Sequence, residues 1–177
     1  SVLDAEGNRA TNSAGWCEHR TQYNDKKQKI AERYLDPDGN PALLSNNYSG
    51  IDREFDENGK VVKETYYDAS GEVGPNKDGM VIVERAYHEA GQQVRIAYFD
   101  ASGAPMAING VCQMAQGYDE AGNVNLEIVL DAEGNRATNS AGWCEHRMTY
   151  DEAKQRISES YFGVDGDPVL CRRRYAA

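Results

Sequence analysis

The sequence contains no long apolar run and no surplus of positive charge. A membrane-spanning helix needs roughly 18 or more consecutive apolar residues, and no stretch of this chain approaches that length. Its 177 residues carry 19 Lys and Arg against 29 Asp and Glu, a formal net charge of -10. Nucleic-acid-binding domains present clustered positive charge, whereas the basic residues here are scattered, except at 172–174. We therefore expect no membrane insertion and no nucleic-acid partner.

Motifs of catalysis are also missing. The chain has no glycine-rich phosphate loop, no Gly-x-Ser-x-Gly and no His-Glu-x-x-His, which are patterns that position a phosphate, a nucleophile or a metal for reaction. Carboxylates are numerous, but they recur at regular intervals, as scaffold residues do. The sequence predicts a protein that is not an enzyme, with no catalytic residue, no cofactor and no metal.

The most regular feature of the chain is an internal repeat. Residues 2–20 recur letter for letter as residues 129–147, 127 positions later, a match that chance cannot produce in a chain of this length. Such self-similarity indicates a tandem array, in which each unit buries its apolar surface against its neighbours. We interpret residues 1–177 as a single repeat array.

A recurring turn signature divides the array into units. An aromatic residue or Leu, then Asp, two residues and Gly return at alternating spacings of 12 and about 20 residues, so that one unit has about 32 residues and two turns. The predicted units are 4–35, 36–67, 68–99, 100–130, 131–162 and a partial unit, 163–177. The first turn positions are Asp4, Asn24, Asp36, Asp56, Asp68, His88, Asp100, Asp119, Asp131, Asp151 and Gly163.

The turn residues favour a type I turn followed by a G1 bulge. Asp at the first position accepts a hydrogen bond from the backbone two residues on, and Gly at the fourth adopts the left-handed conformation. Lys27 and Lys154 stand at that fourth position instead of Gly. Residues 36–40 and 165–167 also look like fragments of a calcium loop, but the further ligands of an EF-hand do not follow in register. We favour turn chemistry over calcium, and we expect His88 to be a solvated turn residue.

The segments between the turns are typical of β-strands. First strands of about eight residues are predicted at 60–67, 92–99 and 123–130, and second strands, each ending on an aromatic residue, at 16–23, 48–55, 80–87, 111–118 and 143–150. Each second strand leads through a turn into the next first strand. The predicted fold class is all-β: antiparallel β-hairpin tandem repeats forming either a solenoid or a long curved meander sheet.

Overlaying the first strands produces columns of equivalent residues. Apolar and tyrosine columns share one face of the sheet, and a mainly acidic column between them is expected to pair with Arg or Lys of neighbouring strands. The acidic column consists of Glu32, Glu64, Ile96, Glu127 and Glu159. Aromatic residues that flank the turns are expected to form the core ladder: Tyr23, Tyr34, Phe55, Tyr66, Tyr87, Tyr98, Tyr118, Tyr150 and Tyr161.

Three cysteines occupy one position of the second strand, and a His or Met follows two residues later on the same face. Thiolate, thioether and imidazole are suitable ligands for copper or zinc, and the four cysteines of the chain also allow a disulfide. Equivalent strands should, however, lie about 10 Å apart, too far for easy bridging, so free thiols are favoured. The residues concerned are Cys17, Cys112 and Cys144 with His19, Met114 and His146, and the fourth cysteine is Cys171.

Three aromatic residues follow the loop of the longer spacing: Trp16, Tyr48 and Trp143. Because they lie outside the turn-flanking columns, they are candidates for an exposed stacking platform that binds a ligand. The alternative is that they pack under the loop.

The half-unit at 118–124, Tyr-Asp-Glu-Ala-Gly-Asn-Val, and its relatives at 55–61 and 67–71 resemble the tyrosine–aspartate (YD) repeats of bacterial Rhs-type surface and secreted proteins. The Gly-Trp pairs at 15–16 and 142–143 are also similar to choline- and glucan-binding hairpin repeats, which carry aromatic cages between hairpins. Both resemblances imply an exported, bacterial, non-catalytic array that is extracellular or at the cell surface.

Two functions follow as hypotheses. The first is a structural and binding segment of a bacterial cell-surface or secreted protein whose repeated face contacts a glycan or protein ligand. The second is a self-assembling scaffold, because the chain begins and ends inside repeat units and unpaired strand edges template association.

Overall fold

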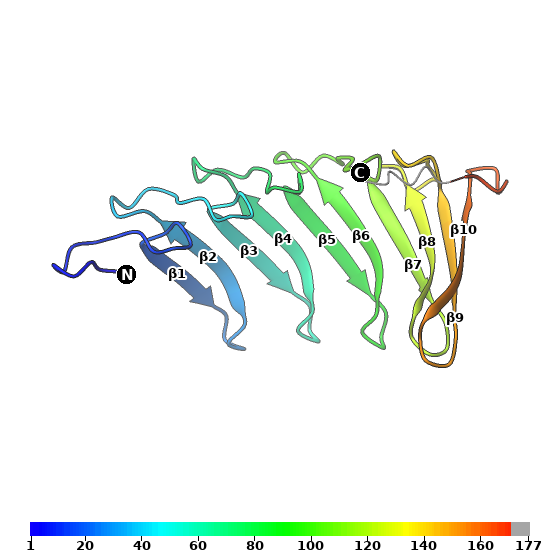
Figure 1. Ribbon diagram of the computed structural model, residues 1–177, viewed down its shortest axis with the longest axis horizontal. Helices are drawn as coiled ribbons and strands as arrows, with labels where there is room; N and C mark the ends of the chain where they lie inside the picture. The colour runs from blue at the N-terminus through cyan, green and yellow to red at the C-terminus, as the bar shows by residue number, and fades with distance from the viewer. Residues whose placement is uncertain (171–177) are drawn as a thin grey trace. The chain divides into compact units, whose positions relative to one another are not determined.

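The computed structural model describes residues 1–170. Ten strands pair in sequence order as an open antiparallel meander that does not close into a barrel (Figure 1), as the predicted fold class requires. Among the described residues there is no helix, and so none long and apolar enough to cross a membrane. The strands are β1 (Glu18–Tyr23), β2 (Lys29–Leu35), β3 (Gly50–Phe55), β4 (Val61–Tyr67), β5 (Ile82–Tyr87), β6 (Gln93–Phe99), β7 (Gln113–Tyr118), β8 (Val124–Leu130), β9 (Glu145–Tyr150) and β10 (Arg156–Phe162).

The tight turns have the predicted chemistry. At the turn between β1 and β2, Lys27 N donates to the Asn24 carbonyl, and the side-chain oxygen of Asn24 accepts from the Lys26 and Gln28 amides. The register then shifts at the end of β1, as a bulge requires. Lys27 and Lys154 take the left-handed conformation, with φ of 60° and 61°. His88 also belongs to this scheme, because its Nδ1 accepts from the Ala90 amide at 3.2 Å.

The second strands begin two residues later than predicted, and the reason lies in the preceding connection. Trp16 is bonded to Asn12 through both its amide and its carbonyl, so it closes a turn and does not join the ladder. Each long connection contains such an additional turn, which the sequence interpretation missed. These turns span 12–15, 44–47, 76–79, 108–111 and 139–142.

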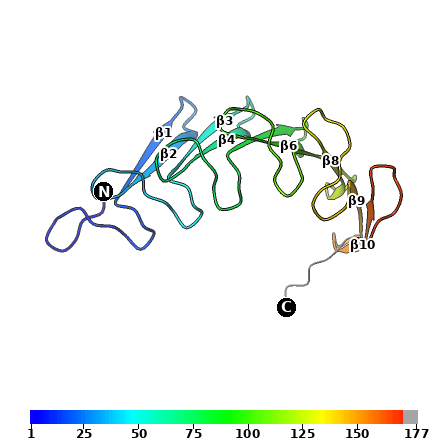
Figure 2. The ribbon, with the colours of Figure 1, turned by 90° about the horizontal axis from the view of Figure 1, so that it is seen from above.

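The chain divides into two compact units. The first, residues 1–84 and 99–104, contains β1 to β4 and the start of β5. Its hairpins join through short ladders, such as Glu32 opposite Ile51 in β2 and β3. Its successive long connections lie side by side (Figure 2), and Lys77 N donates to the Asn46 carbonyl at 2.8 Å between two of them. Its buried apolar residues are Cys17, Leu35, Ala42, Ile51, Tyr66, Val81 and Val83.

The second unit comprises residues 85–98 and those from 105 onward. It contains most of β6 and all of β7 to β10, joined between hairpins by ladders such as Glu127 opposite His146. Ser140 N donates to the Asn109 carbonyl at 2.9 Å, the counterpart of the connection-to-connection bond in the first unit. Its buried apolar residues are Ala97, Val111, Val129, Cys144 and Met148.

Two sequence expectations about side chains have clear outcomes. Cys17, Cys112 and Cys144 are free thiols, as favoured, while Cys171 lies outside the described residues. The expectation that every turn-flanking aromatic residue belongs to the core is wrong for Tyr23, which is 59% exposed. Tyr118 and Tyr150 instead donate their hydroxyls to backbone carbonyls of a neighbouring hairpin, Gln93 and Val124.

Candidate ligand-binding clefts

A row of rings crosses one face of the first unit. His19 of β1 stacks on Tyr34 of β2, with centroids 4.5 Å apart and planes at 1°. Trp16 lies 6.0 Å from Tyr34 on one side, and Tyr48 lies 6.4 Å from it on the other. Tyr48 continues to Tyr66 of β4 at 5.5 Å, edge to face. Tilted and edge contacts at these distances are favourable for aromatic pairs, so the rings form a connected row.

The first cleft is a hollow of about 440 Å³ beside Trp16 and Tyr34. Its rim comes from the additional turns of two successive long connections, and its floor from β1 and β2. No Asp, Glu, Lys or Arg side chain lines it. The lining residues are Ser13, Ala14, Trp16, His19, Tyr34, Leu44, Ser45 and Asn46.

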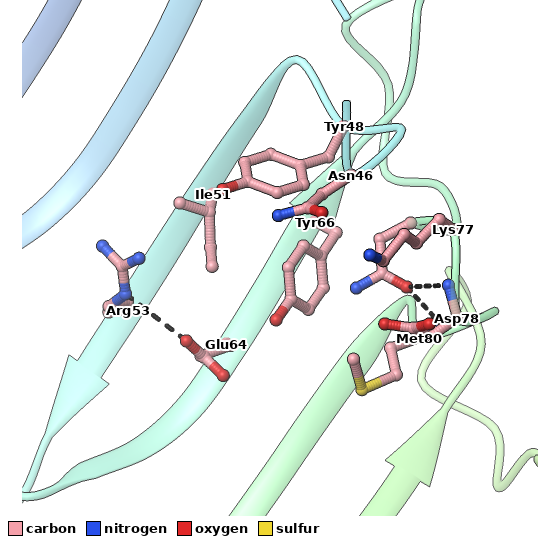
Figure 3. Close-up of a pocket in the computed structure, with 10 residues that line it drawn as sticks. Asn46, Tyr48, Ile51, Arg53, Glu64, Tyr66, Lys77, Asp78 and Met80 are labelled. Carbon is pink, nitrogen blue, oxygen red and sulfur yellow. Dashed lines mark hydrogen bonds and ion pairs between the residues drawn. The ribbon is translucent and has the colours of Figure 1, made fainter. Parts of the chain in front are cut away.

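The second cleft, of about 300 Å³, lies beside Tyr48 and Tyr66. Figure 3 shows these two rings between the strand residues Arg53 and Glu64 and the loop residues of the next connection. This cleft is charged, since an Arg53–Glu64 pair with 3.4 Å between Nε and Oε1 lies on its floor. The lining residues are Asn46, Tyr48, Ile51, Arg53, Glu64, Tyr66, Asn76, Lys77, Asp78 and Met80.

The two clefts are the same site in successive hairpins. Tyr48 takes the place of Trp16, and Tyr66 the place of Tyr34, 32 positions later in the sequence. Asn46 lines both clefts and is therefore their common wall. The repeat thus places neighbouring hollows along one face of the first unit.

The buried carboxylate of Glu32 contacts two rings of this row, those of His19 and Tyr34. Glu32 is 6% exposed; its Oε1 accepts from Arg53 at 2.7 Å, and its Oε2 lies 3.0 Å from Lys29 Nζ. The same Oε2 lies 2.9 Å from His19 Nε2 and accepts from the Tyr34 hydroxyl at 3.2 Å. Burial alone would raise the pKa of Glu32, but hydrogen bonds and charge from Arg53 and Lys29 outweigh burial and lower the pKa to about 2. Glu32 is therefore ionised and orients both His19 and Tyr34.

The tyrosines of the clefts are held neutral. Burial, with the charge of Glu32 adding to it, raises the pKa of Tyr34 to about 12. Burial followed by the same carboxylate also raises the pKa of Tyr48. Both rings therefore keep a hydroxyl proton in the neutral range, and their faces remain available for stacking.

The three predicted ligand-binding residues are divided between the two units. Trp16 and Tyr48 are half-buried and line the first and second clefts, linked through Tyr34. Trp143 belongs to the second unit, where it lies 5.7 Å from His146 and 5.8 Å from Tyr161. All three rings are half-buried, and that they bind a ligand stays a prediction.

Sequence reasoning missed the loop residues that complete the clefts. Asn46, Lys77 and Asp78 lie in the additional turns. The available signal was Asn followed three residues later by Gly, at 12–15, 76–79 and 139–142. The expected pairing of the acidic column was confirmed for Glu32 and Glu64, since Arg53 of β3 lies between them. Glu127 contacts His146 of β9 instead.

The fold and the clefts define an open, all-β array of antiparallel hairpins with repeated aromatic hollows. No protein-family model and no curated protein match the chain. Among solved structures, it is similar to the crystal structure of TcdB2-TccC3 at 18% identity and TM-score 0.22, over 83% of this chain and 9% of that chain. It is also similar to the crystal structure of TcdB2-TccC3-TEV at 13% identity and TM-score 0.21, over 82% of this chain and 10% of that chain.

This chain therefore spans about a tenth of the length of each of those chains. At these TM-scores the likeness supports no functional argument. Assignment to the YD repeats stays a prediction, while the hairpin architecture itself is confirmed.

Proposed function

We propose that the chain is a non-catalytic binding segment of a bacterial cell-surface or secreted protein, and that it binds glycan through its repeated clefts. The observation that carries this proposal is the pair of equivalent hollows that share Asn46 as a wall. Each combines half-buried rings with a polar rim, the combination that small-ligand sites use for contact area and orientation. A sugar presents a C–H face for the rings and hydroxyls for the rim.

The first cleft favours glycan over protein as the ligand. Its rim carries neutral hydrogen-bonding groups, from Ser13, Ser45 and Asn46. A neutral polar ligand can therefore form hydrogen bonds there without burying a charged group that lacks a partner. A charged protein surface would find a partner only in the second cleft, at Arg53, Glu64, Lys77 or Asp78. A protein ligand would therefore engage one cleft, whereas a glycan can use both.

A glycan array tests the proposal. The wild-type chain is compared with a Trp16→Ala and Tyr48→Ala double variant, and with Tyr23→Ala, which removes an exposed ring outside the clefts. We expect the wild type and Tyr23→Ala to retain the same glycans and the double variant to lose them. Retention of no glycan by the wild type, or equal retention by all three proteins, removes the proposal.

A second candidate function is self-assembly through a sheet edge. Its supporting observation is that β1 is the outer strand of the first unit and pairs with β2 alone among the described strands, and unpaired edges favour association. Sedimentation over a concentration series measures it directly. Mass that grows with concentration supports the scaffold, and a constant monomer mass at high concentration removes it.

A further inference from the structure

The rims of the two clefts differ at one pair of equivalent positions. Ser45 and Asn46 of one long connection line the first cleft. Lys77 and Asp78 of the next connection, 32 positions later in the sequence, line the second cleft. The same hollow therefore has neutral groups at this point in one repeat, and a cation beside an anion in the next.

The backbone of Lys77 and Asp78 is fixed by hydrogen bonds. Asn76 is 7% exposed, and its side-chain oxygen accepts from the amides of Asp78 and Met80 at 2.9 and 3.0 Å. Lys77 N donates to the Asn46 carbonyl of the neighbouring connection at 2.8 Å. None of these bonds uses the side chain of Lys77 or Asp78, so the turn holds both side chains at the rim without consuming their polar groups.

The two rim charges also differ from the charges on the floor of the cleft. The Arg53 guanidinium on the floor already pairs with carboxylates. Within residues 1–170, neither the Lys77 ammonium nor the Asp78 carboxylate makes an ion pair, and both residues are exposed. Figure 3 shows them on the other side of the Tyr66 ring from Arg53. A ligand group on this ring therefore meets a donor and an acceptor that the fold does not use.

Apolar surface lies in the same cleft. Ile51 is 2% exposed and Met80 is half-buried, so Met80 offers most of the aliphatic surface that a ligand reaches. Tyr48 and Tyr66 add the surface of their rings. The volume of about 300 Å³ is at the lower end of the range for ligand pockets, which suits one sugar ring with a small substituent.

An acetamido group matches this combination of contacts. Like the amide of an Asn side chain, it has an N–H that donates and a carbonyl oxygen that accepts, and it ends in a methyl group. A hydroxyl in its place brings no methyl to Met80. An ammonium group presents only donors, so it would pair with Asp78 but not with Lys77. Hydrogen bonds to ionised partners are also stronger than those between neutral groups.

We propose that the second cleft binds an N-acetylated amino sugar. The acetamido carbonyl accepts from Lys77, its N–H donates to Asp78, and its methyl group packs against Met80. The assignment rests on the proposed glycan binding and specifies the sugar class at one of the two clefts. The first cleft has Ser45 and Asn46 at the equivalent rim positions, so it has no charged pair that selects this substituent.

Three tetrasaccharides with the same β-1,4-linked backbone test the proposal. They differ only at carbon 2 of each sugar, which carries a hydroxyl, an amine or an acetamido group. Each is titrated into the wild-type chain by calorimetry at mildly acidic pH, where the amine is protonated. We expect the acetamido tetramer to bind about tenfold more tightly than the other two, the value of a hydrogen bond to a charged group.

The wild-type result separates this assignment from the proposed function. Equal affinity for the hydroxyl and acetamido tetramers keeps glycan binding but overturns the assignment, and so does tightest binding of the amine tetramer. No binding of the acetamido tetramer also overturns the assignment, while the glycan array decides glycan binding as a whole.

Rim variants separate the substituent from the sugar ring. Lys77→Ala and Asp78→Ala should each remove most of the preference for the acetamido tetramer and leave the affinity for the hydroxyl tetramer unchanged. Lys26→Ala, outside both clefts, is the matched control and should keep the preference. Tyr48→Ala should weaken both tetramers, because the ring contacts the sugar itself. A preference that survives in both rim variants contradicts the assignment.

Discussion

At the scale of single residues, Glu32 shows how one buried charge organises a binding face. Its carboxylate contacts Arg53, Lys29, His19 and Tyr34. A buried carboxylate is tolerated only when hydrogen bonds and opposite charge compensate for lost hydration, and here four groups share that role. The rings of the first cleft are held in place by this ionised group.

Replacing Glu32 should therefore change both stability and its acid dependence. Glu32→Gln should lower the free energy of unfolding at pH 7 by about 1–3 kcal/mol, because charged hydrogen-bond partners lose their acceptor. Since folding lowers the pKa of Glu32 from 4.5 to about 2, its contribution is present above pH 4.5 and is lost as the pH falls toward 2. Denaturant titrations between pH 7 and 2 check this.

The variant should lose less stability than the wild type between pH 4.5 and 2. Glu57→Gln, at an exposed position, is the control and should follow the wild-type curve. Parallel curves for Glu32→Gln and the wild type across this range would mean that Glu32 does not make the contacts described.

Gly50 is the second residue on which packing depends. A Cβ at this position would lie 2.6 Å from Arg33 Cδ and 2.8 Å from the Glu32 carbonyl oxygen. Arg33 cannot move freely, because it bonds to Asp52 at 2.6 Å and covers the Tyr67 ring. Gly50→Ala should therefore destabilise the chain by about 1–3 kcal/mol.

Gly117→Ala provides the comparison. There the new Cβ meets the Leu126 Cβ at 3.2 Å, a milder contact, so the loss of stability should be smaller. Equal denaturation midpoints for Gly50→Ala and the wild type would show that Arg33 does not pack over Gly50.

At the scale of elements, the hairpin turns were predictable and the long connections were not. Asp or Asn followed by a left-handed fourth residue is local chemistry, so the spacing located the turns of every hairpin, including those with Lys27 and Lys154. The face shared by Glu32, Tyr34 and Tyr66 followed from the alternation of side chains along a strand. The strand starts were wrong because Trp16 and its equivalents bond to turns in the preceding connection.

Lys154 offers a test of the turn chemistry. A side chain in the left-handed conformation is unfavourable by roughly 1–2 kcal/mol, and Lys154 has a φ of 61°. Lys154→Gly should raise the free energy of unfolding by about 1 kcal/mol, while Lys154→Ala should not raise it, since Ala keeps the strained backbone. Thermal unfolding compares them, and equal effects would contradict this account of the turn.

At the scale of the molecule, the identical segments show what sequence identity does and does not determine. Val2 N donates to the Cys17 carbonyl at 2.7 Å, and Val129 N donates to that of Cys144 at 2.8 Å, so the local frame is reproduced. In the second copy, Glu127 of the preceding strand, β8, also contacts His146. The sequence therefore predicted the repeat but not the contacts of His19 and His146 with carboxylates of neighbouring strands, which depend on how successive strands pair.

The clefts also depend on how successive repeats pack, and not on local sequence alone. Trp16 and Tyr48 were identified as candidates from their position after the loop. Their continuity through Tyr34 and the common wall at Asn46 arise from the packing of one long connection beside the next. Equivalent strands of neighbouring hairpins are about 10 Å apart, so the array presents repeated hollows at a spacing that a linear glycan can span.

The central claim is that neighbouring clefts act as one binding surface, and an affinity series tests it most directly. Oligomers of increasing length, from the glycan class retained on the array, are titrated into the wild type and Tyr48→Ala by calorimetry. The account predicts that wild-type affinity rises at least tenfold, about 1.4 kcal/mol, once the oligomer spans both clefts, and that Tyr48→Ala shows no such rise. An affinity independent of length, or the same rise in Tyr48→Ala, would contradict it.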